Sequence, residues 1–284
     1  MRDLPSIRKK LFLLVLACII PTVFGFAVLF KHFYQKERMQ FEQNTLNNAH
    51  ALVLGVDRDL SSIKTAALVL SASPYLEQND LASFHAYAKK FITADFPGFA
   101  FSLSDAKGQQ ILNTLRPFGE ALPMHSNPSQ VHRVFETEKP VVSDLFMGES
   151  TQRPSLSIDV PVWLHGRVAY SLAVEIYPER LADVLVEQLL PENYIVGIFD
   201  TKGIVVARSR EQEKYIGKYG AMLPAQRLLE KNEGQLETTT FEGIPVYSFF
   251  SRSAVSGWTV AIGIPKKTVQ LELFKSLSWI AVIV

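Results

Sequence analysis

The sequence predicts an α+β fold in which a long N-terminal helix precedes two tandem modules with antiparallel sheets, flanked by transmembrane helices. Three observations support this prediction. An uncharged apolar run occupies residues 11–30. Apolar residues then recur at alternating steps of three and four between Leu46 and Leu70, which is typical of a packed helix. Finally, a strand–turn–strand pattern with an Asp-x-Lys-Gly turn occurs twice, at 98–114 and 194–209.

The composition excludes several classes of protein. The chain of 284 residues is 48% hydrophobic and carries 29 Lys and Arg against 28 Asp and Glu. This is too apolar and too weakly charged for a disordered chain. The even charge balance argues against a nucleic-acid partner held through its phosphates. The single cysteine cannot form an internal disulfide framework or a zinc cluster of several cysteines.

The apolar run at 11–30 predicts a transmembrane helix, because twenty helical residues rise about 30 Å. Four basic residues within 1–10 favour a cytoplasmic N-terminus, although basic residues also follow the run. A cleaved signal peptide is the alternative, but the run is long and no A-x-A-like site follows it. We interpret Cys18 as a buried membrane cysteine rather than a lipid attachment site.

The C-terminal end predicts a second membrane segment. Residues 265–284 are expected to form a helix that enters a truncated second transmembrane helix, because 277–284 are apolar but far fewer than the ~20 residues needed. We therefore expect the chain to be the N-terminal part of a longer protein. Residues 31–276 are expected to lie outside the cytoplasmic membrane.

Between the anchors, residues 34–73 are predicted to form one long signalling helix. The segment 34–72 contains no proline, and Pro74 disfavours helix at the preceding residue. Two interpretations of its apolar stripe remain open: a core helix of its own domain, or the seam of a homodimer. The stripe consists of Leu46, Ala49, Val53, Val56, Leu60, Ile63, Ala67 and Leu70.

The repeated pattern predicts two modules of the same kind, at 75–180 and 181–264. The turns that begin at Asp105 and Asp200 both end in glycine, which permits positive φ. Later in each module, a strand that begins after Gly166 or Gly257 runs into a proline that starts a helix. Each module therefore combines a mostly antiparallel sheet with short helices.

Together these features resemble the double Cache region of bacterial receptors, in which two PAS-like modules lie between two membrane anchors. The resemblance covers residues 31–276 and rests also on the segments 113–119 and 256–265. It implies an extracytoplasmic sensor in the bacterial inner membrane, most similar to those of sensor histidine kinases. A diguanylate cyclase or chemoreceptor sensor is the first alternative, and an anchored module that binds a partner protein without a small ligand is the second.

The resemblance also implies where a ligand binds. In that family the small-molecule pocket usually lies in the membrane-distal module, here 75–180, and the membrane-proximal module is 181–264. The residues agree, because alternation puts Ser155, Ser157 and Asp159 on one strand face, where they can contact a polar ligand. An ordinary solvated strand face is the alternative.

Arg116 lies in a turn after the second strand and could clamp a carboxylate, or could simply pair with Glu120. Together with Arg133 it favours an organic acid as the ligand. The tyrosine–arginine–tryptophan–tyrosine pattern of the family's amine-recognising members is not found here. The other candidate ligand-binding residues are Asp144 and Arg153, which flank a long polar loop, and the aromatic residues Phe101, Phe118 and Tyr170 as pocket walls.

The sequence contains no recognisable catalytic motif, so we expect no enzyme, cofactor or metal site within this chain. His125 and His132 are interpreted as surface residues, because their spacing crosses Pro128. The expected partners are a small molecule, the membrane and a second copy of the chain.

Overall fold

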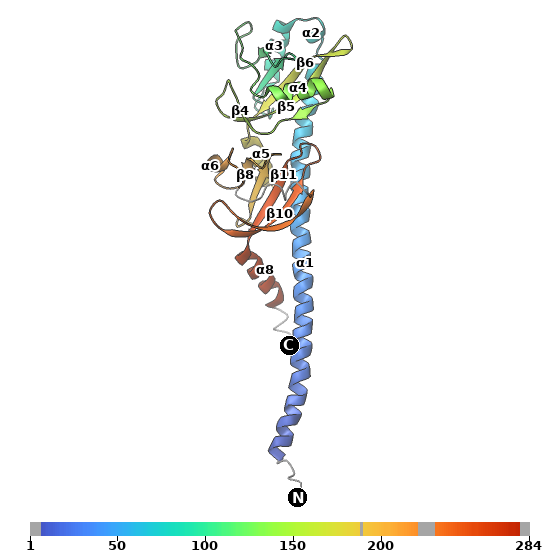
Figure 1. The fold of residues 1–284 in the computed structure, drawn as a ribbon, viewed down its shortest axis with the longest axis vertical. Coiled ribbons are helices and arrows are strands. Elements are labelled where there is room, and N and C mark those ends of the chain that lie inside the picture. Colours follow the sequence, from blue (N-terminus) through green and yellow to red (C-terminus); the bar gives the residue numbers. More distant parts are fainter. Residues whose placement is uncertain (1–6, 188–189, 221–230, 279–284) are drawn as a thin grey trace. The chain divides into compact units, whose positions relative to one another are not determined.

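The computed structural model describes residues 7–187, 190–220 and 231–278 (Figure 1). These residues form two compact units. One unit holds the described residues up to Thr45 together with those from Lys266 onward, and the other is Leu46–Pro265. The second unit contains both predicted modules.

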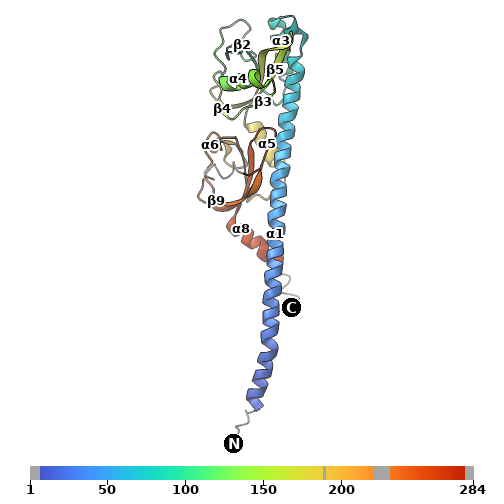
Figure 2. The same cartoon turned by 45° about the vertical axis from the view of Figure 1, so that its right-hand side comes forward.

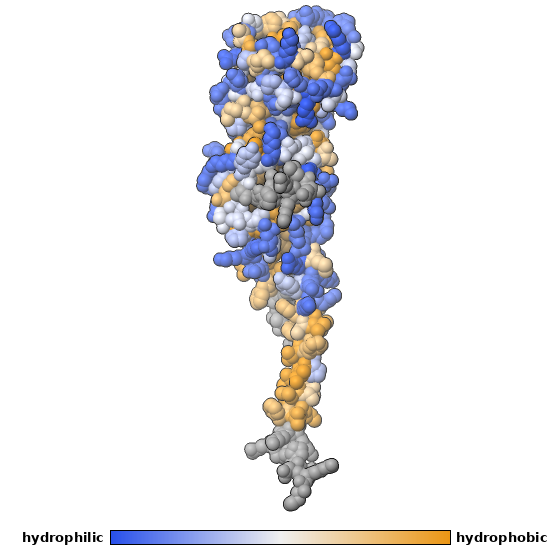
Figure 3. Space-filling model, in the orientation of Figure 1, coloured by the Kyte–Doolittle hydropathy of each residue, from blue (hydrophilic) through white to orange (hydrophobic). Residues whose placement is uncertain are grey.

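In the first unit, helix α1 (Ile7–Ser71) begins and then continues without a break into the second unit. Pro21 lies inside the helix and does not interrupt it. The predicted transmembrane span 11–30 and the predicted signalling helix 34–73 therefore belong to one helix, which ends at Ser71. The part of α1 from Leu11 onward is long and apolar enough to cross a membrane, and Figure 3 shows apolar residues covering its N-terminal part. Helix α8 (Lys266–Ser278) lies in the same unit, where Ser276 donates a hydrogen bond of 2.8 Å to Glu37. The predicted second membrane segment lies largely outside the described residues.

The first module is built on an antiparallel sheet with the strand order β2-β1-β6-β5-β3, in which β4 also pairs with β5. The long hairpin of β5 and β6 forms its centre. The elements are α2 (Pro74–Glu77), α3 (Leu81–Phe91), β1 (Ala100–Ser104), β2 (Gln110–Asn113), α4 (Pro128–Thr137), β3 (Val141–Val142), β4 (Phe146–Met147), β5 (Pro154–Leu164) and β6 (Arg167–Ile176).

The second module repeats this arrangement with the strand order β8-β7-β11-β10-β9. Its pairings are also antiparallel, so the predicted α+β fold with two antiparallel sheets is confirmed. Its elements are α5 (Glu179–Glu187), β7 (Ile195–Phe199), β8 (Val205–Arg208), α6 (Gln212–Tyr215), β9 (Glu233–Thr239), β10 (Pro245–Arg252) and β11 (Thr259–Pro265).

The two predicted turns fold alike. Asp105 Oδ1 accepts hydrogen bonds of 2.9 Å from the backbone N–H groups of Lys107 and Gln109. Asp200 Oδ1 does the same with Lys202 and Ile204, also at 2.9 Å. The glycines that end these turns have φ of 81° and 79°, a conformation that side-chain-bearing residues rarely adopt.

The apolar stripe of α1 belongs to the core of the second unit. Val53, Leu60 and Ile63 are at most 3% exposed, and Gly55 lies against Val184 of α5. Figure 2 shows α1 and α4 on opposite sides of β5. Of the two interpretations left open by the sequence, the core helix is confirmed and the dimer seam is wrong, because the side chains from Ala49 to Leu70 are already buried within the chain.

Candidate ligand sites

One face of the first sheet is polar and fully buried. Ser155, Ser157 and Asp159 share this face of β5, as alternation predicts, and each is 0% exposed. The alternative of a solvated strand face is therefore wrong. Helix α4 covers this face, since its Gln130 donates a 2.7 Å hydrogen bond to Asp159.

Strand register extends the polar face across the sheet. Asp159 pairs with Ala173 of β6, and Ala173 pairs with Ser102 of β1. Ser171 and Glu175 lie two positions before and after Ala173 on the same face. The small Ala173 side chain is therefore surrounded by four polar residues. We call Ser102, Ser104, Ser155, Ser157, Asp159, Ser171 and Glu175 the polar face.

Asp159 is held by neighbouring side chains. Its Oδ1 accepts hydrogen bonds from Gln130 Nε2 and Ser157 Oγ, each 2.7 Å long, and its Oδ2 accepts one of 3.3 Å from Ser171 Oγ. His125 Nε2 lies 3.9 Å from Asp159 Oδ2, and its side chain is 2% exposed. The prediction of a surface position is wrong for His125, because the loop before α4 folds over the polar face. It holds for His132, which is exposed.

Two features of the polar face are unusual for a purely structural core. Burial, reinforced by the nearby Asp159 carboxylate, raises the pKa of Glu175 to about 7. The hydroxyl of Ser104 is buried and has no hydrogen-bond partner among the described residues, and that of Ser102 makes only a weak contact with the Glu175 carboxyl. Buried polar groups are normally satisfied, so the Ser104 hydroxyl points to a further partner on this face.

The predicted arginines and loop residues lie away from this face. Arg116 and Arg133 are exposed. Arg153 is also exposed, forms a 2.9 Å ion pair with Glu179 and stacks on Tyr177. Asp144 instead contacts the second module, where it accepts two hydrogen bonds from Thr201. The structure does not bring these residues together with Asp159.

The predicted aromatic walls need correction. Phe101 pairs with Val174, and Tyr170 pairs with Val162. By alternation both lie on the sheet face opposite Asp159, so they cannot line a site on the polar face. Phe118 is 49% exposed, with its ring 5.9 Å from that of His85.

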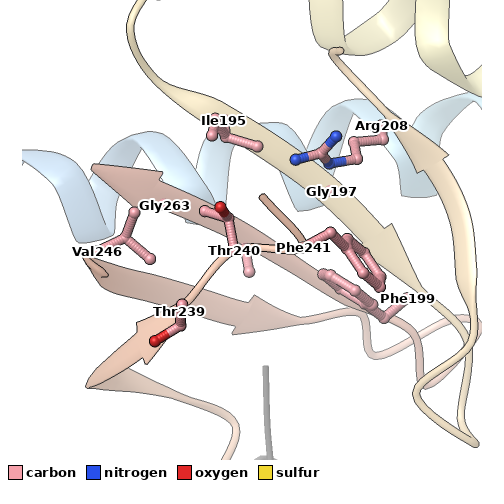
Figure 4. Close-up of a pocket in the computed structure, with 10 residues that line it drawn as sticks. Ile195, Gly197, Phe199, Arg208, Thr239, Thr240, Phe241, Val246 and Gly263 are labelled. Atoms are coloured by element: carbon pink, nitrogen blue, oxygen red, sulfur yellow. The ribbon is translucent and has the colours of Figure 1, made fainter. Parts of the chain in front are cut away.

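The second module contains an apolar cavity of about 30 Å³ (Figure 4). Arg208 of β8 and Val246 of β10 lie at opposite sides of it. Gly197, Ala261 and Gly263 are the small residues that line it on the sheet. The remaining lining residues are Ile195, Phe199, Thr239, Thr240 and Phe241.

Sequence reasoning missed Gln130, Glu175 and Arg208. Glu175 could have been found, since a glutamate inside the strand pattern at 167–176 is a candidate for burial. Gln130 and Arg208 carry no such local signal, because their partners lie far away in the sequence. Among the described residues, no group of three His, Cys, Asp or Glu side chains could hold a metal ion.

Comparison with solved structures relates the fold to known sensor regions. The extracellular domain of a histidine kinase is 14% identical, with a TM-score of 0.60 over 82% of this chain and 97% of its own. A methyl-accepting chemotaxis protein is 14% identical, with a TM-score of 0.65 over 81% and 100%. The ligand-binding domain of the Pseudomonas aeruginosa amino-acid chemoreceptor PctB, solved with L-Arg, is 12% identical, with a TM-score of 0.61 over 84% and 93%.

No protein-family model and no curated protein matches the sequence. At these identities the structural likeness concerns the fold. The chain has the fold of the extracellular ligand-binding regions of histidine kinases and chemoreceptors, as the double Cache resemblance predicted.

Proposed function

We propose that this chain is the extracytoplasmic sensing region of a bacterial receptor, and that it binds a small amine-bearing molecule on the polar face of the first module. One observation carries the proposal: the buried Ser104 hydroxyl lacks a partner, and that of Ser102 has only a weak one, on a face that also holds Asp159 and Glu175. Unsatisfied buried hydroxyls and carboxylates suit a small polar ligand with several hydrogen-bond donors.

The charge of the face favours a cation over the organic acid expected from the sequence. Asp159 and Glu175 are acidic and buried, whereas Arg116 and Arg133 are exposed. A ligand ammonium group would offset the repulsion that helps to raise the pKa of Glu175. A free carboxylate placed on the same face would add a third negative charge without a neighbouring cation.

Three of the structural neighbours were solved with amino acids: asparagine in Mlp24, L-Arg in PctB and L-serine in the Pseudomonas fluorescens chemoreceptor CtaA. An amino acid carries the ammonium group that the polar face requires. We therefore propose small amines, and amino acids whose carboxylate lies away from Asp159 and Glu175, as the ligand class. Their charged amine would reach Asp159 and Glu175, and the hydroxyls of Ser102 and Ser104 would accept or donate the remaining hydrogen bonds.

The proposed signal is a shift between two arrangements of the first module, one of which the ligand favours. Loop residue Asp144 links the first module to the second, and β11 leads directly into α8. A change at the polar face could thus reach α8, and α1 carries the other end of the sensor toward the proposed inner-membrane anchor. We propose a homodimer and a histidine-kinase output; a chemoreceptor output is the alternative, and the reading frame after residue 284 separates the two.

The experiment uses the whole chain in detergent micelles and two ligand panels, amino acids with simple amines in one and carboxylic acids in the other. Amine-bearing ligands should raise the melting temperature, and Asp159→Asn and Ser102→Ala should remove that rise. His132→Gln, an exposed change on α4, is the matched control and should retain it. Stabilisation by carboxylic acids alone would contradict the proposal.

A further inference from the structure

The two modules carry different chemistry at equivalent positions. The two sheets have the same strand order, so residues that pair side by side across the strands of one sheet have equivalents in the other. We compare one such row of paired residues in each sheet. In the first sheet this row crosses β2, β1, β6 and β5, and in the second it crosses β8, β7, β11 and β10. The row of the first sheet is Asn113, Ser102, Ala173 and Asp159. The row of the second sheet is Arg208, Gly197, Ala261 and Phe250.

The second-module cavity therefore lies at the position of the polar face. Glycine replaces both Ser102 and Glu175, because Gly263 follows Ala261 by two residues, as Glu175 follows Ala173. The acidic groups are absent from this row, because Phe250 stands at the position of Asp159, and a buried cation, Arg208, stands at the position of Asn113. The second site is thus apolar and positive where the first is polar and acidic.

The cation is Arg208, whose side chain is 5% exposed. Its guanidinium lies over the rings of Tyr215 and Phe241, at 4.5 Å and 5.7 Å from their centroids. Nη2 forms an ion pair of 2.8 Å with Glu242, and Nη1 donates to the carbonyl of Arg210. Stacking and the backbone contact fix the guanidinium, so its position does not depend on Glu242 alone.

Glu242 belongs to the connection between β9 and β10, and its side chain is 28% exposed. Two neighbours of Glu242, Thr240 and Phe241, line the cavity. A partly exposed carboxylate on a connecting loop can leave its partner at much lower cost than one on a buried strand. The internal carboxylate thus occupies a place that a ligand carboxylate can take.

The glycine at position 263, which helps to keep the cavity beside Arg208 open, is not needed for the backbone conformation. At Gly263 an added Cβ would lie 3.5 Å from both Val246 and Ile195, which is ordinary contact, and its φ is not positive. Alanine would therefore fit at this position and fill part of the space. Glycine keeps the space open next to a buried cation.

We propose that this cavity is a second binding site for a short-chain monocarboxylate, whose carboxylate replaces that of Glu242 on Arg208 and whose alkyl group occupies the cavity. At about 30 Å³ the cavity holds one or two water molecules, which limits the alkyl group to roughly two or three carbons. The departing Glu242 side chain leaves the room for the carboxylate. This site is independent of the amine site proposed for the first module.

Sodium propionate titrated into the whole chain in detergent micelles, followed by calorimetry, tests the proposal, with propionamide as the uncharged counterpart. Propionate should bind and propionamide should not. Glu242→Gln should tighten propionate binding about tenfold, because a neutral amide competes less well for a guanidinium. Arg208→Gln should abolish binding.

Gly263→Ala keeps the test decisive if Arg208→Gln fails to fold. It should weaken propionate binding while leaving acetate binding closer to its original strength, because it removes space and no charge. Arg153→Gln is the matched control, because Arg153 is an exposed arginine that also pairs with a glutamate and stacks on a tyrosine. It should leave propionate binding unchanged. Absence of propionate binding even in Glu242→Gln, or binding indifferent to Gly263→Ala, would overturn the proposal.

Discussion

The carboxylate of Asp144 in the first module accepts hydrogen bonds from both the backbone N–H and the hydroxyl of Thr201 in the second. The distances are 3.0 Å from the nitrogen to Oδ1 and 2.7 Å from the hydroxyl to Oδ2. Lys202 Nζ lies 3.7 Å from the same carboxylate, and Asp200 accepts a hydrogen bond from the backbone of Leu145. The long polar loop flanked by Asp144, which was predicted to contact a ligand, therefore joins the repeated turn of the second module.

We predict that Thr201→Val weakens the communication between the modules more than it weakens the fold. The change removes one charge-assisted hydrogen bond, worth roughly 1–3 kcal/mol, and keeps the shape of the side chain. Hydrogen exchange of the described part of the second module, measured with and without the first-module ligand, should lose its ligand dependence. Ligand affinity should stay the same.

Thr137→Val is the matched control for that experiment. Thr137 donates a hydrogen bond to Arg133 within α4 and is exposed, so the same chemical change occurs without any link between modules. Ligand-dependent exchange should persist in this variant. If it also persists in Thr201→Val, the Asp144 contact does not transmit the signal.

Local patterns in the sequence were sufficient for the elements and the repeat. The Asp-x-Lys-Gly turns at Asp105 and Asp200 fold with matching hydrogen bonds, and alternation along β5 correctly grouped Ser157 with Asp159. These features depend on neighbours within a few residues, where periodicity and turn chemistry are informative.

What covers each face depends on contacts far apart in the sequence. The cover of Asp159 comes from Gln130, 29 residues away, and the ion pair of Arg208 comes from Glu242, 34 residues away. The stripe of α1 shows the same limit, since an apolar face looks identical whether it meets its own sheet or a second copy. Alternation also places Phe101 on the face opposite Asp159, but this follows only once β1 is known to pair with β6.

The raised pKa of Glu175 predicts that stability depends on pH. The folded protein retains the Glu175 proton to about pH 7, whereas the ordinary value is 4.5. Between these values the folded state binds more protons than the unfolded state, so stability falls as the pH rises. The loss amounts to at most about 3 kcal/mol.

Glu175→Gln should flatten this part of the stability profile, measured by denaturant unfolding between pH 4.5 and 8. Glu179→Gln, which changes an exposed glutamate at the start of α5, should leave the slope in place. An unchanged slope in Glu175→Gln would show that the carboxyl does not titrate in this window. By the same linkage, an amine ligand should bind more tightly at pH 8 than at pH 6, since the ionised Glu175 attracts it.

The buried stripe of α1 predicts that truncating two leucines of this helix to alanine has very different effects on stability. Leu60 is 1% exposed and Leu54 is 56% exposed, although both lie on the same helix. Leu60→Ala should lower the free energy of unfolding by about 2–5 kcal/mol, because it leaves a cavity. Leu54→Ala should change it by less than about 0.5 kcal/mol. Equal costs would mean that the stripe is not packed against the sheets.

A homodimer through α1 must use its outer surface, because the stripe is occupied. Leu54 and Val69 are large apolar residues on that surface, at 56% and 65% exposure. Single cysteines at these two positions, in a Cys18→Ser background, should form disulfide-linked dimers in membranes under mild oxidation, because parallel copies would bring equivalent residues together. Val53→Cys, next to Leu54 but 2% exposed, should not crosslink. Crosslinking at Val53 would contradict the buried stripe, and its absence at all three positions would place the dimer contact away from this helix.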